Sequence, residues 1–423
     1  MVQHCGKQGS FFRRACTNAG RCAKIALEQL FVSLALQKGD LFMRILHTAD
    51  WHLGRVFHGL SLLEDQAVLL KQVRQIAREE KADVLVMAGD VYDRGLPPTD
   101  AVELLDETLS AFALDLQIPV LLIAGNHDNA KRLEYGKALF AGRNIHFFGS
   151  VGATAPDPVV VPDLLGGDVY FCPLPFCDPL TASQASGASI KDFEAVLRWQ
   201  RDRILTKVPA GARTVALAHT FVTGARQSPD SERPLAIGGT TNVGLSVFEP
   251  FQYTALGHLH AQQHLGPKAA YSGSLMKYSF NEYVQKKGVV LADLAADGAV
   301  TLTDIPLTAP HDLDILRGSF AELMAHPDSE KAGRHLQVTL TDRTPILDVK
   351  AKLETVYPLL LSVRYEQLQA AQEETAVEAR RGLSDQELFR EFFQQVHGEA
   401  MSVQEETILR ETLEALERER RNA

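Results

Sequence analysis

Five short polar motifs contain the kinds of side chain that bind divalent metal ions in proteins. Carboxylate, amide and imidazole groups suit hard or borderline cations, and no cysteine is needed. In chain order the motifs are Asp50-Trp51-His52, Gly89-Asp90, Gly125-Asn126-His127-Asp128, His219 and Gly257-His258-Leu259-His260. Two neighbouring cations activate a water and offset negative charge, which hydrolysis of a phosphate ester requires. The ordered set therefore predicts a binuclear hydrolytic site.

Each side-chain type suggests a role in such a site. Asp90 is the expected bridging carboxylate, because one or both of its oxygens can contact two ions. Asp50 and His52 are two residues apart, so in an extended segment both point to one side and can reach one ion. His258 and His260 repeat that spacing, although their imidazoles can serve different ions. Asn126 supplies a neutral oxygen, which limits the negative charge of the site.

His127 is next to an expected ligand, and its better role is to donate a proton or hydrogen bond to the leaving oxygen or the charged transition state. A histidine in that role needs an acceptor to orient it. Asp93 is the preferred candidate and Asp128 the alternative, although Asp128 could equally cap the helix that follows. Arg94 could clamp a phosphate oxygen or could be a solvated surface charge.

Taken singly, each motif is a weak signal, but most of them follow short apolar segments that we predict to be buried strands. Alternating strands and helices predict a mostly parallel sheet with helices on both faces, and functional groups collect at the carboxyl ends of its strands. The first three strands are predicted at Arg44–Thr48, Asp83–Ala88 and Pro119–Ala124, with helices at Leu63–Glu80 and Thr99–Leu116. Further strands are predicted at Ile145–Phe148, Val159–Val161, Val169–Cys172, Arg213–Leu217, Gln252–Leu256 and Gly288–Asp293.

A second, smaller domain is predicted after a boundary near Pro306–Pro310. The expected elements are strand Leu313–Arg317, helix Ser319–Ala325, strand His335–Thr341, helix Ile346–Val356 and strand Leu360–Tyr365. Beyond Leu368 we expect only helices, because capping boxes at Ser384–Glu387 and Ser402–Glu405 each precede one apolar stripe. The two stripes could pack on the body of the protein, but we favour a docking surface for a partner.

Composition limits the possible classes of protein. The chain has 423 residues and a formal net charge of -10. This negative charge argues against a stand-alone nucleic-acid binder, unless local basic patches or a partner subunit provide the contacts to the phosphates. No segment has the length and apolarity of a membrane span. The five cysteines show no Cys-x-x-Cys spacing, so a reduced, cytoplasmic setting fits best.

Residues 1–42 differ from the rest of the chain. They contain Cys5, Cys16 and Cys22 and a short apolar run, Leu30–Leu36. A basic start before an apolar segment is compatible with an export signal, but no small-residue cleavage pattern follows. We favour a disordered extension upstream of a natural start at Met43.

The ordered motifs resemble those of the calcineurin-like metallophosphoesterase superfamily. Within it, Met43–Gly54 is similar to the opening of the SbcD family, the nuclease subunits of bacterial SbcC–SbcD complexes. Supporting stretches are Ala88–Asp93 with Pro97-Pro98, Gly125–Asp128, Ala255–His260, Tyr271–Ser274 and Leu383–Phe393. The resemblance covers the chain from Met43 onward and leaves residues 1–42 unmatched.

The resemblance implies an α/β fold, a metallophosphoesterase sandwich at 43–308 with helices on both faces. A small α/β capping domain at 309–367 and a helical tail at 368–423 would follow. It implies two metal ions, most commonly Mn²⁺. One would be held by Asp50, His52, Asp90 and His260, and the other by Asp90, Asn126, His219 and His258, with His127 assisting catalysis.

The resemblance also implies partners and an activity. The tail helices would dock on an SbcC-like ATPase, and two copies would pair through helices 99–116 and 130–141. The implied activity is metal-dependent, ATP-stimulated cleavage of double-stranded DNA ends and hairpins, by exonuclease action on duplexes and endonuclease action on single strands. The basic residues nearest the motifs are the candidate DNA contacts, namely Arg55, Arg94, Lys131, Arg132 and Lys277.

One residue departs from part of the resemblance. Archaeal and eukaryotic relatives have a further histidine where this chain has Asp93, which favours Asp93 as the carboxylate that orients His127. Two other functions remain open. One is a binuclear phosphoesterase for phosphoproteins or small nucleotides, which would not need a capping domain or an amphipathic tail. The other is a non-catalytic scaffold that tethers DNA, which would not need seven metal ligands.

Overall fold

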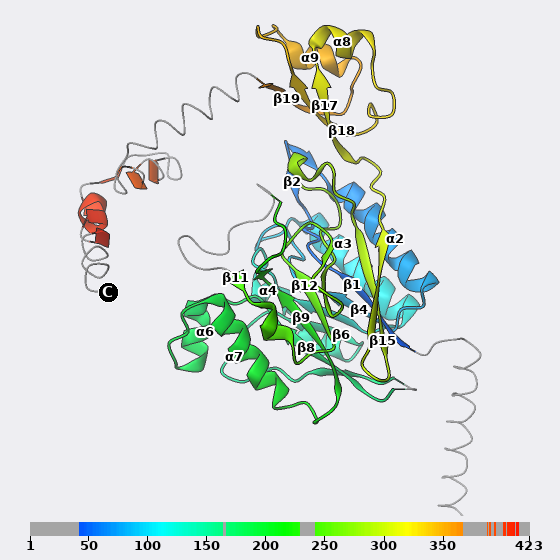
Figure 1. Ribbon diagram of the computed structural model, residues 1–423, viewed down its shortest axis with the longest axis vertical. Coiled ribbons are helices and arrows are strands. Elements are labelled where there is room, and N and C mark those ends of the chain that lie inside the picture. Colours follow the sequence, from blue (N-terminus) through cyan, green and yellow to red (C-terminus); the bar gives the residue numbers. More distant parts are fainter. Residues whose placement is uncertain are drawn as a thin grey trace, which may run out of the picture. The chain divides into compact units, whose positions relative to one another are not determined.

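The structure is a computed structural model that describes residues 42–163, 166–228 and 242–366, together with residues 387, 389–390, 393–394, 401–402, 404–410 and 412–413 of the tail (Figure 1). It divides into two compact units, one ending at Asp314 and the other beginning at Ile315. The division falls inside a strand, a few residues after the predicted boundary near Pro306–Pro310. Each unit is described by itself.

The first unit contains two six-stranded sheets. Sheet one has the strand order β16-β15-β1-β4-β5-β6, in which β1, β4, β5 and β6 are parallel and β15 and β16 are antiparallel additions at one edge. Its strands are β1 (Phe42–Thr48), β4 (Val84–Met87), β5 (Val120–Ile123), β6 (Ile145–Phe148), β15 (Gly288–Ala295) and β16 (Val300–Pro306).

Sheet two has the order β13-β14-β12-β9-β8-β7, with parallel β14, β12, β9 and β8 in its centre. Its strands are β7 (Val159–Val161), β8 (Val169–Leu174), β9 (Arg213–His219), β12 (Tyr253–Gly257), β13 (Gln263–His264) and β14 (Ala269–Tyr271). Two two-residue ladders accompany the sheets, formed by β2 (Val56–Phe57) with β3 (Leu60–Ser61) and by β10 (Phe221–Val222) with β11 (Asn242–Val243).

The strands of sheet one alternate between two hydrophobic cores. Val84 and Val86 contact one cluster, in which side chains of both sheets interdigitate, whereas Leu85 and Met87 contact another that lies beneath helices. Sheet two contributes Val215 and its neighbours to the shared cluster, and its other face packs against α7. Helices therefore cover the outer faces of a stacked pair of sheets, as the family resemblance implied.

The strand–helix alternation alone predicted a single sheet with helices on both faces, and this was wrong. The second face of sheet one is covered by another sheet. A strand buried on both faces has the same apolar pattern whether a helix or a sheet covers it, so local sequence cannot distinguish the two cases.

The helices of the first unit are mostly short. Figure 1 places α2 and α3 on one side of the stacked sheets and α6 and α7 on the other. They are α2 (Leu63–Glu79), α3 (Thr99–Ser110), α4 (Ala130–Leu133), α5 (Lys137–Ala141), α6 (Pro179–Ser186) and α7 (Phe193–Leu205), with π-helical η1 (Ala111–Leu116) and 3₁₀-helical η2 (Leu245–Phe248) and η3 (Phe280–Glu282).

Two predicted helices differ in detail from the structure. The helix predicted at Thr99–Leu116 is α-helical only to Ser110, and its last turn is the π-helix η1, which ends at Gln117 with a left-handed backbone. The helix implied at 130–141 is broken into α4 and α5, because Gly136 has a φ of +71°. Of the elements that were not predicted, β16 is an edge strand with four exposed residues and β13 has only two residues.

The second unit has a three-stranded sheet in the order β17-β18-β19, with β18 and β19 parallel. Its elements are β17 (Leu313–Gly318), α8 (Phe320–Ala325), β18 (His335–Leu340), α9 (Val349–Glu354) and β19 (Leu360–Tyr365). The order of strands and helices is the predicted one. Leu336, Val338, Leu353 and Tyr357 are fully buried, so the unit has a core of its own.

Several expectations concern residues outside those described, including the extension before Phe42 and the capping box that begins at Ser384. The second capping box is present, because Ser402 N donates to Glu405 Oε2 at 2.8 Å and Glu405 N donates to Ser402 Oγ at 3.4 Å. Residues 404–410 behind it are helical. Among the described helices, none combines the length and apolarity that crossing a bilayer demands.

Candidate metal centre

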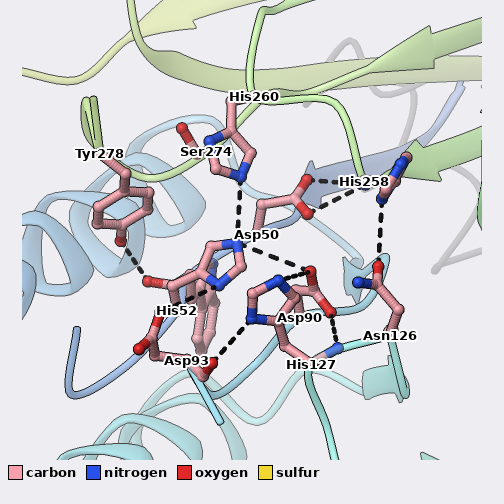
Figure 2. Close-up of polar contacts among 12 residues, drawn as sticks. Asp50, His52, Asp90, Asp93, Asn126, His127, His258, His260, Ser274 and Tyr278 are labelled. Carbon is pink, nitrogen blue, oxygen red and sulfur yellow. Dashed lines mark hydrogen bonds and ion pairs between the residues drawn. The ribbon is translucent and has the colours of Figure 1, made fainter. Parts of the chain in front are cut away.

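The predicted ligands converge at one edge of the two sheets. They lie at or just beyond the carboxyl ends of five parallel strands, which are β1, β4 and β5 of sheet one and β9 and β12 of sheet two. Figure 2 shows Asp50, His52, Asp90, His258 and His260 directed toward a common centre. The side chains of all but Asn126 are buried. Loops at the ends of parallel strands meet at one sheet edge, which explains how positions so far apart in sequence come together.

The ligand loops have an unusual backbone. Asp50, His52, Asp90 and His258 have φ values of +52°, +46°, +54° and +101°. For residues other than glycine such values cost on the order of 1–3 kcal/mol each and persist only where the surroundings impose them. Here the imposing contacts are Asp50 N to the carbonyl of Gly89 and His52 N to the carbonyl of Asp90, both 3.0 Å.

This geometry corrects one step of the sequence argument. Asp50 and His52 reach the same centre, but not because they lie on one side of an extended segment. β1 ends at Thr48, and the two left-handed residues turn both side chains inward. His258 also departs from extended geometry, beyond the end of β12. The spacing correctly predicted that Asp50 and His52 reach one centre. The cause is the left-handed backbone that the loop contacts impose, not an extended segment.

Glycines allow the loops to approach one another closely. A Cβ on Gly125 would lie 2.1 Å from Asp90 Oδ1 and 2.4 Å from Asp90 N. A Cβ on Gly89, whose φ is +95°, would lie 2.3 Å from His219 Nδ1. Any side chain at either position would displace an expected ligand, so the glycines of these motifs are required by packing.

One half of the centre contains Asp50, His52 and His260. Each offers a ligand atom within 4.8 Å of the others. The two imidazoles face each other, with Nε2 of His52 3.1 Å from Nε2 of His260. Asp90 Oδ2 lies 3.7 Å from His52 Nε2. Both Asp50 oxygens also accept a hydrogen bond from the main-chain N–H of His258, at 3.0 and 3.1 Å, which ties the loop after β1 to the loop after β12.

The other half contains Asn126, His219 and His258. Asn126 Oδ1 lies 2.9 Å from His219 Nε2 and 3.2 Å from His258 Nδ1. Asp90 Oδ2 is 3.4 Å from His219 Nε2, so this one oxygen faces both halves. The other oxygen of Asp90 accepts from the main-chain N–H of His127 at 2.9 Å. Asp90 therefore has the position that a bridging carboxylate would need.

The donor set fits divalent cations. His219 Nδ1 lies 2.9 Å from the carbonyl oxygen of Ala88, and a carbonyl can only accept, so Nδ1 carries a proton and Nε2 is the ring atom that faces the centre. Tautomers fixed in this way are typical of metal-binding histidines. His52 Nδ1 is buried without a hydrogen-bond partner. Oxygen and imidazole donors without a cysteine suit a hard or borderline ion.

Burial and mutual proximity shift the pKa values of these groups. Burial lowers the pKa of His258 to about 3 and takes that of His52 well below its usual value, so both rings are neutral at neutral pH. Burial raises the pKa of Asp50 to about 7. Burial also disfavours charge on Asp90 and His219, but their attraction outweighs it. The pKa of Asp90 falls well below its usual value and that of His219 rises to about 9.

His127 has a different orienting group from the one predicted. Its Nδ1 lies 2.8 Å from the main-chain carbonyl of Asp93, not from the Asp93 carboxylate. That carboxylate instead accepts from Arg55 Nη1 at 2.8 Å and lies 3.8 Å from His52 Nδ1. The loop therefore presents the main-chain carbonyl of residue 93 to His127 and its carboxylate to Arg55. His127 Nε2 is 4.0 Å from Asp90 Oδ2, at the centre of the site.

Asp128 is neither the orienting group nor a helix cap. Its carboxylate accepts main-chain hydrogen bonds from Val91, Tyr92 and Gly125, at 3.1, 2.9 and 2.9 Å. The cap of α4 is Asn129, whose Oδ1 accepts from Arg132 N. Asp128 therefore ties the loop after β4 to the loop after β5, and so holds Asp90 beside Asn126.

The five basic candidates for DNA contact differ in their surroundings. Arg94, Lys131 and Arg132 are exposed, whereas Arg55 is half-buried against Asp93 and lies 5.4 Å from the ring centre of Tyr278. Lys277 is 7% exposed, and its ammonium donates to Asp312 Oδ2 and to the carbonyls of Tyr283 and Leu313. These three internal bonds argue against a DNA contact for Lys277, because its ammonium would have to leave them to reach a phosphate.

Several residues that were not predicted hold the ligands through hydrogen bonds to their side chains or their backbone. Glu282 Oε1 lies 3.0 Å from His260 Nδ1, and Lys287 lies against the other oxygen of Glu282. Gln66 donates to the carbonyls of Trp51 and His52 at 3.0 and 2.9 Å, and Tyr278 donates to Trp51 O. None of them is in a recognisable motif. Their only sequence signal is being polar within otherwise apolar stretches.

Comparison with known proteins gives the same class of protein as the fold and the site. The family model described as calcineurin-like phosphoesterase matches residues 43–262, more than half of the chain. A second model, described as type 5 capsule protein repressor C-terminal domain, matches residues 309–397. The chain belongs to the calcineurin-like phosphoesterase family.

Among curated proteins, the chain is similar to the SbcD subunit of the nuclease SbcCD of Staphylococcus epidermidis. The two are 32% identical over 327 residues, which are 76% of this chain and 85% of the relative, and this places the chain in the SbcD family of nuclease subunits. Two solved structures are more distant. A dimetal phosphatase from Danio rerio is 13% identical and covers 64% of this chain and 100% of its own, with a TM-score of 0.38. The TT1561 protein of Thermus thermophilus is 12% identical and covers 62% and 99%, with a TM-score of 0.35.

Proposed function

We propose that this protein is the nuclease subunit of an SbcC–SbcD-type complex and that it hydrolyses DNA phosphodiesters with two divalent metal ions. The observation that carries the proposal is the convergence of seven side chains with oxygen or imidazole donors, Asp90 among them, at one centre. The similarity to the SbcD subunit of the nuclease SbcCD supports DNA as the substrate. The implied role is in DNA repair, recombination and replication.

The metals fall into two proposed positions that share Asp90. Asp50, His52, Asp90 and His260 would hold one ion, and Asp90, Asn126, His219 and His258 would hold the other. Manganese is proposed because the resemblance to the SbcD family implies it, and carboxylate oxygens are compatible with this ion. When bound, two such cations supply an activated water and offset the charge that develops on the phosphate.

The residues of this chain have their own parts in the reaction. Asp90 keeps one oxygen hydrogen-bonded to the main chain of His127 and directs the other at the centre, so the two halves of the site cannot move independently. His127 donates a hydrogen bond from Nδ1 to the main-chain carbonyl of Asp93. Its Nε2 therefore faces the centre of the site, where it can interact with the phosphate or the leaving oxygen. Arg55, fixed by Asp93, lies close enough to His52 to attract a phosphate into the site.

The test is cleavage of labelled DNA by the full-length protein. Blunt duplexes, hairpins and single strands are incubated with Mn²⁺, with and without EDTA, and Asp90→Asn is the matched control. We expect cleavage by the wild type that EDTA abolishes, and a loss of at least about 100-fold in Asp90→Asn, because the bridging ligand contributes to both ion positions.

Two outcomes would support the other functions. Hydrolysis of small phosphodiesters or a phosphopeptide, without cleavage of any DNA, would favour a phosphoesterase with a small substrate. DNA binding that is equal in wild type and Asp90→Asn, with no hydrolysis by either, would favour a scaffold.

We also propose that the tail docks on an SbcC-like ATPase and that ATP stimulates cleavage through this partner. The capping box at Ser402 and the helix at 404–410 support a helical tail, and Ile408 is 63% exposed. Ile408→Asp should reduce co-purification with an SbcC-like partner and remove ATP stimulation, while leaving cleavage by the isolated subunit unchanged. ATP stimulation that survives loss of co-purification would contradict this docking. We also propose a cytoplasmic setting, because the five cysteines show no Cys-x-x-Cys spacing or disulfide framework and the proposed substrate is DNA.

A further inference from the structure

The two halves of the metal centre differ in the groups behind their histidines. His219 Nδ1 contacts the carbonyl of Ala88, a neutral acceptor, at 2.9 Å. His260 Nδ1 contacts Glu282 Oε1, a carboxylate, at 3.0 Å. A carboxylate behind a histidine fixes the ring and makes its other nitrogen a stronger metal ligand. Of these two histidines, His260 is therefore the one with a carboxylate behind its ring.

Glu282 is held firmly in this role. Its side chain is fully buried, and Lys287 Nζ lies 2.5 Å from Oε2, the oxygen that does not face His260. The same ammonium donates to the main-chain carbonyl of His260 and to Ser274 Oγ, both at 2.8 Å. One lysine thus fixes both the backbone of the ligand and the carboxylate behind its ring.

The second ligand in this half also has a carboxylate nearby. Asp93 Oδ1 lies 3.8 Å from His52 Nδ1, which is beyond hydrogen-bond distance but close enough for electrostatic attraction. At the other half, Asn126 contributes a neutral oxygen between His219 and His258. A carboxylate also lies 4.0 Å from His219 Nδ1, but it belongs to Asp50, which is itself an expected ligand. The two halves therefore differ in the carboxylates that are not ligands.

We propose that Glu282, held by Lys287, is a positioning residue that makes the ion position at His52 and His260 the tighter of the two. The inference rests on the proposed metal-dependent function. It adds that the two ions bind with different affinities and that one buried ion pair sets the difference.

The experiment is a calorimetric Mn²⁺ titration of the full-length protein, with anomalous diffraction at the manganese edge to locate each ion. Glu282→Gln keeps the size and an acceptor oxygen but removes the charge. We expect two binding steps in the wild type. In the variant the tighter step should weaken by about 10–100-fold, with occupancy lost at His52 and His260 and the second step unchanged.

A second variant guards against misfolding. Glu282→Gln alone leaves the Lys287 ammonium buried without its counter-charge, which can unfold the protein. Glu282→Gln combined with Lys287→Met removes both charges and should fold, which circular dichroism checks, yet show the same selective weakening. Asp304→Asn is the matched control, because it breaks an exposed carboxylate–histidine pair, Asp304 with His264 at 2.8 Å, outside the site.

The outcomes separate this inference from the function on which it rests. Equal weakening of both steps, or no change in either step in a folded variant, overturns the role of Glu282, even if the wild type cleaves DNA with Mn²⁺. A wild-type protein that binds no Mn²⁺ would overturn the proposed function and this inference together.

Discussion

At the scale of single residues, the structure separates groups that the sequence could only rank by type. His127 is oriented by the main-chain carbonyl of Asp93, whereas the Asp93 carboxylate is paired with Arg55. Lys277 and Arg132 are both basic residues near the motifs, but one is locked in internal bonds and the other is exposed. These distinctions lead to two predictions.

Replacement of His127 should impair the chemical step more than replacement of Asp93. His127→Asn should lower kcat by about 100- to 10,000-fold, the usual contribution of a positioned proton donor. Asp93→Asn keeps the carbonyl that holds His127, so its effect should be at least tenfold smaller. Single-turnover cleavage at saturating Mn²⁺ measures both. Equal losses in the two variants would restore the carboxylate as the orienting group.

Salt dependence should distinguish Arg132 from Lys277. If Arg132 contacts a phosphate, Arg132→Ala should weaken binding to all DNA sequences and lower the slope of log K against log salt by about 0.9. Lys277→Met should leave the slope unchanged and lower the melting temperature, because Asp312 loses its partner. A slope that falls for Lys277→Met, or a loss for Arg132→Ala confined to some DNA sequences, would contradict these assignments. Fluorescence anisotropy over a range of salt concentrations gives the slopes.

At the scale of elements, the strained loops at the strand ends are the units that build the site. The loops after β1, β4 and β5 hold each other through main-chain bonds and through Asp128, which accepts from both Gly125 and Val91. Their close approach leaves no space for side chains at the glycines. Stability and metal binding should therefore be coupled there.

Gly125→Ala tests that coupling. The added Cβ would lie 2.1 Å from Asp90 Oδ1, so either the loop or the bridging ligand must move. We expect a loss of about 1–3 kcal/mol in the free energy of unfolding and weakened Mn²⁺ binding. Gly152→Ala is the control, since its Cβ would meet nothing within 4 Å. Thermal melts and Mn²⁺ titrations measure the two effects, and a Gly125→Ala protein with normal metal binding would contradict the packing argument.

At the scale of the whole molecule, the exposed apolar side chains of one segment bear on how copies of the chain assemble. The segment 130–141 exposes two large apolar side chains, Tyr135 at 85% and Leu139 at 82%. Large apolar groups this exposed commonly mark interaction sites when they form a patch. They support the proposed homodimer through 99–116 and 130–141, even though the second helix is broken into two.

Leu139→Asp should shift a dimer to monomer, because it places a charge in the proposed apolar contact. Leu180→Asp on α6, at 69% exposure and outside the proposed interface, is the matched control and should leave the assembly unchanged. Sedimentation equilibrium of the full-length protein distinguishes the states. A wild type that is monomeric at all concentrations, or a dimer insensitive to Leu139→Asp, would rule out this interface.

The sequence by itself determined the class of the protein and most of the elements near the site. β6 and β7 coincide with their predicted ranges, and β1, β4 and β5 differ by one or two residues at their ends. These features depend on local apolar periodicity and on residue chemistry, and both can be recognised within a few consecutive residues. The ligand types and their placement in loops after strands were predictable for the same reason.

Only the tertiary structure decided which groups meet. The second sheet over sheet one, the left-handed backbone at Asp50 and His52, and the contact of Glu282 with His260 all depend on how separate loops pack. The same holds for Asp93, whose carbonyl and carboxylate face different partners. A residue's type limits what it can bind, but the contacts between distant segments determine which of its atoms faces which neighbour.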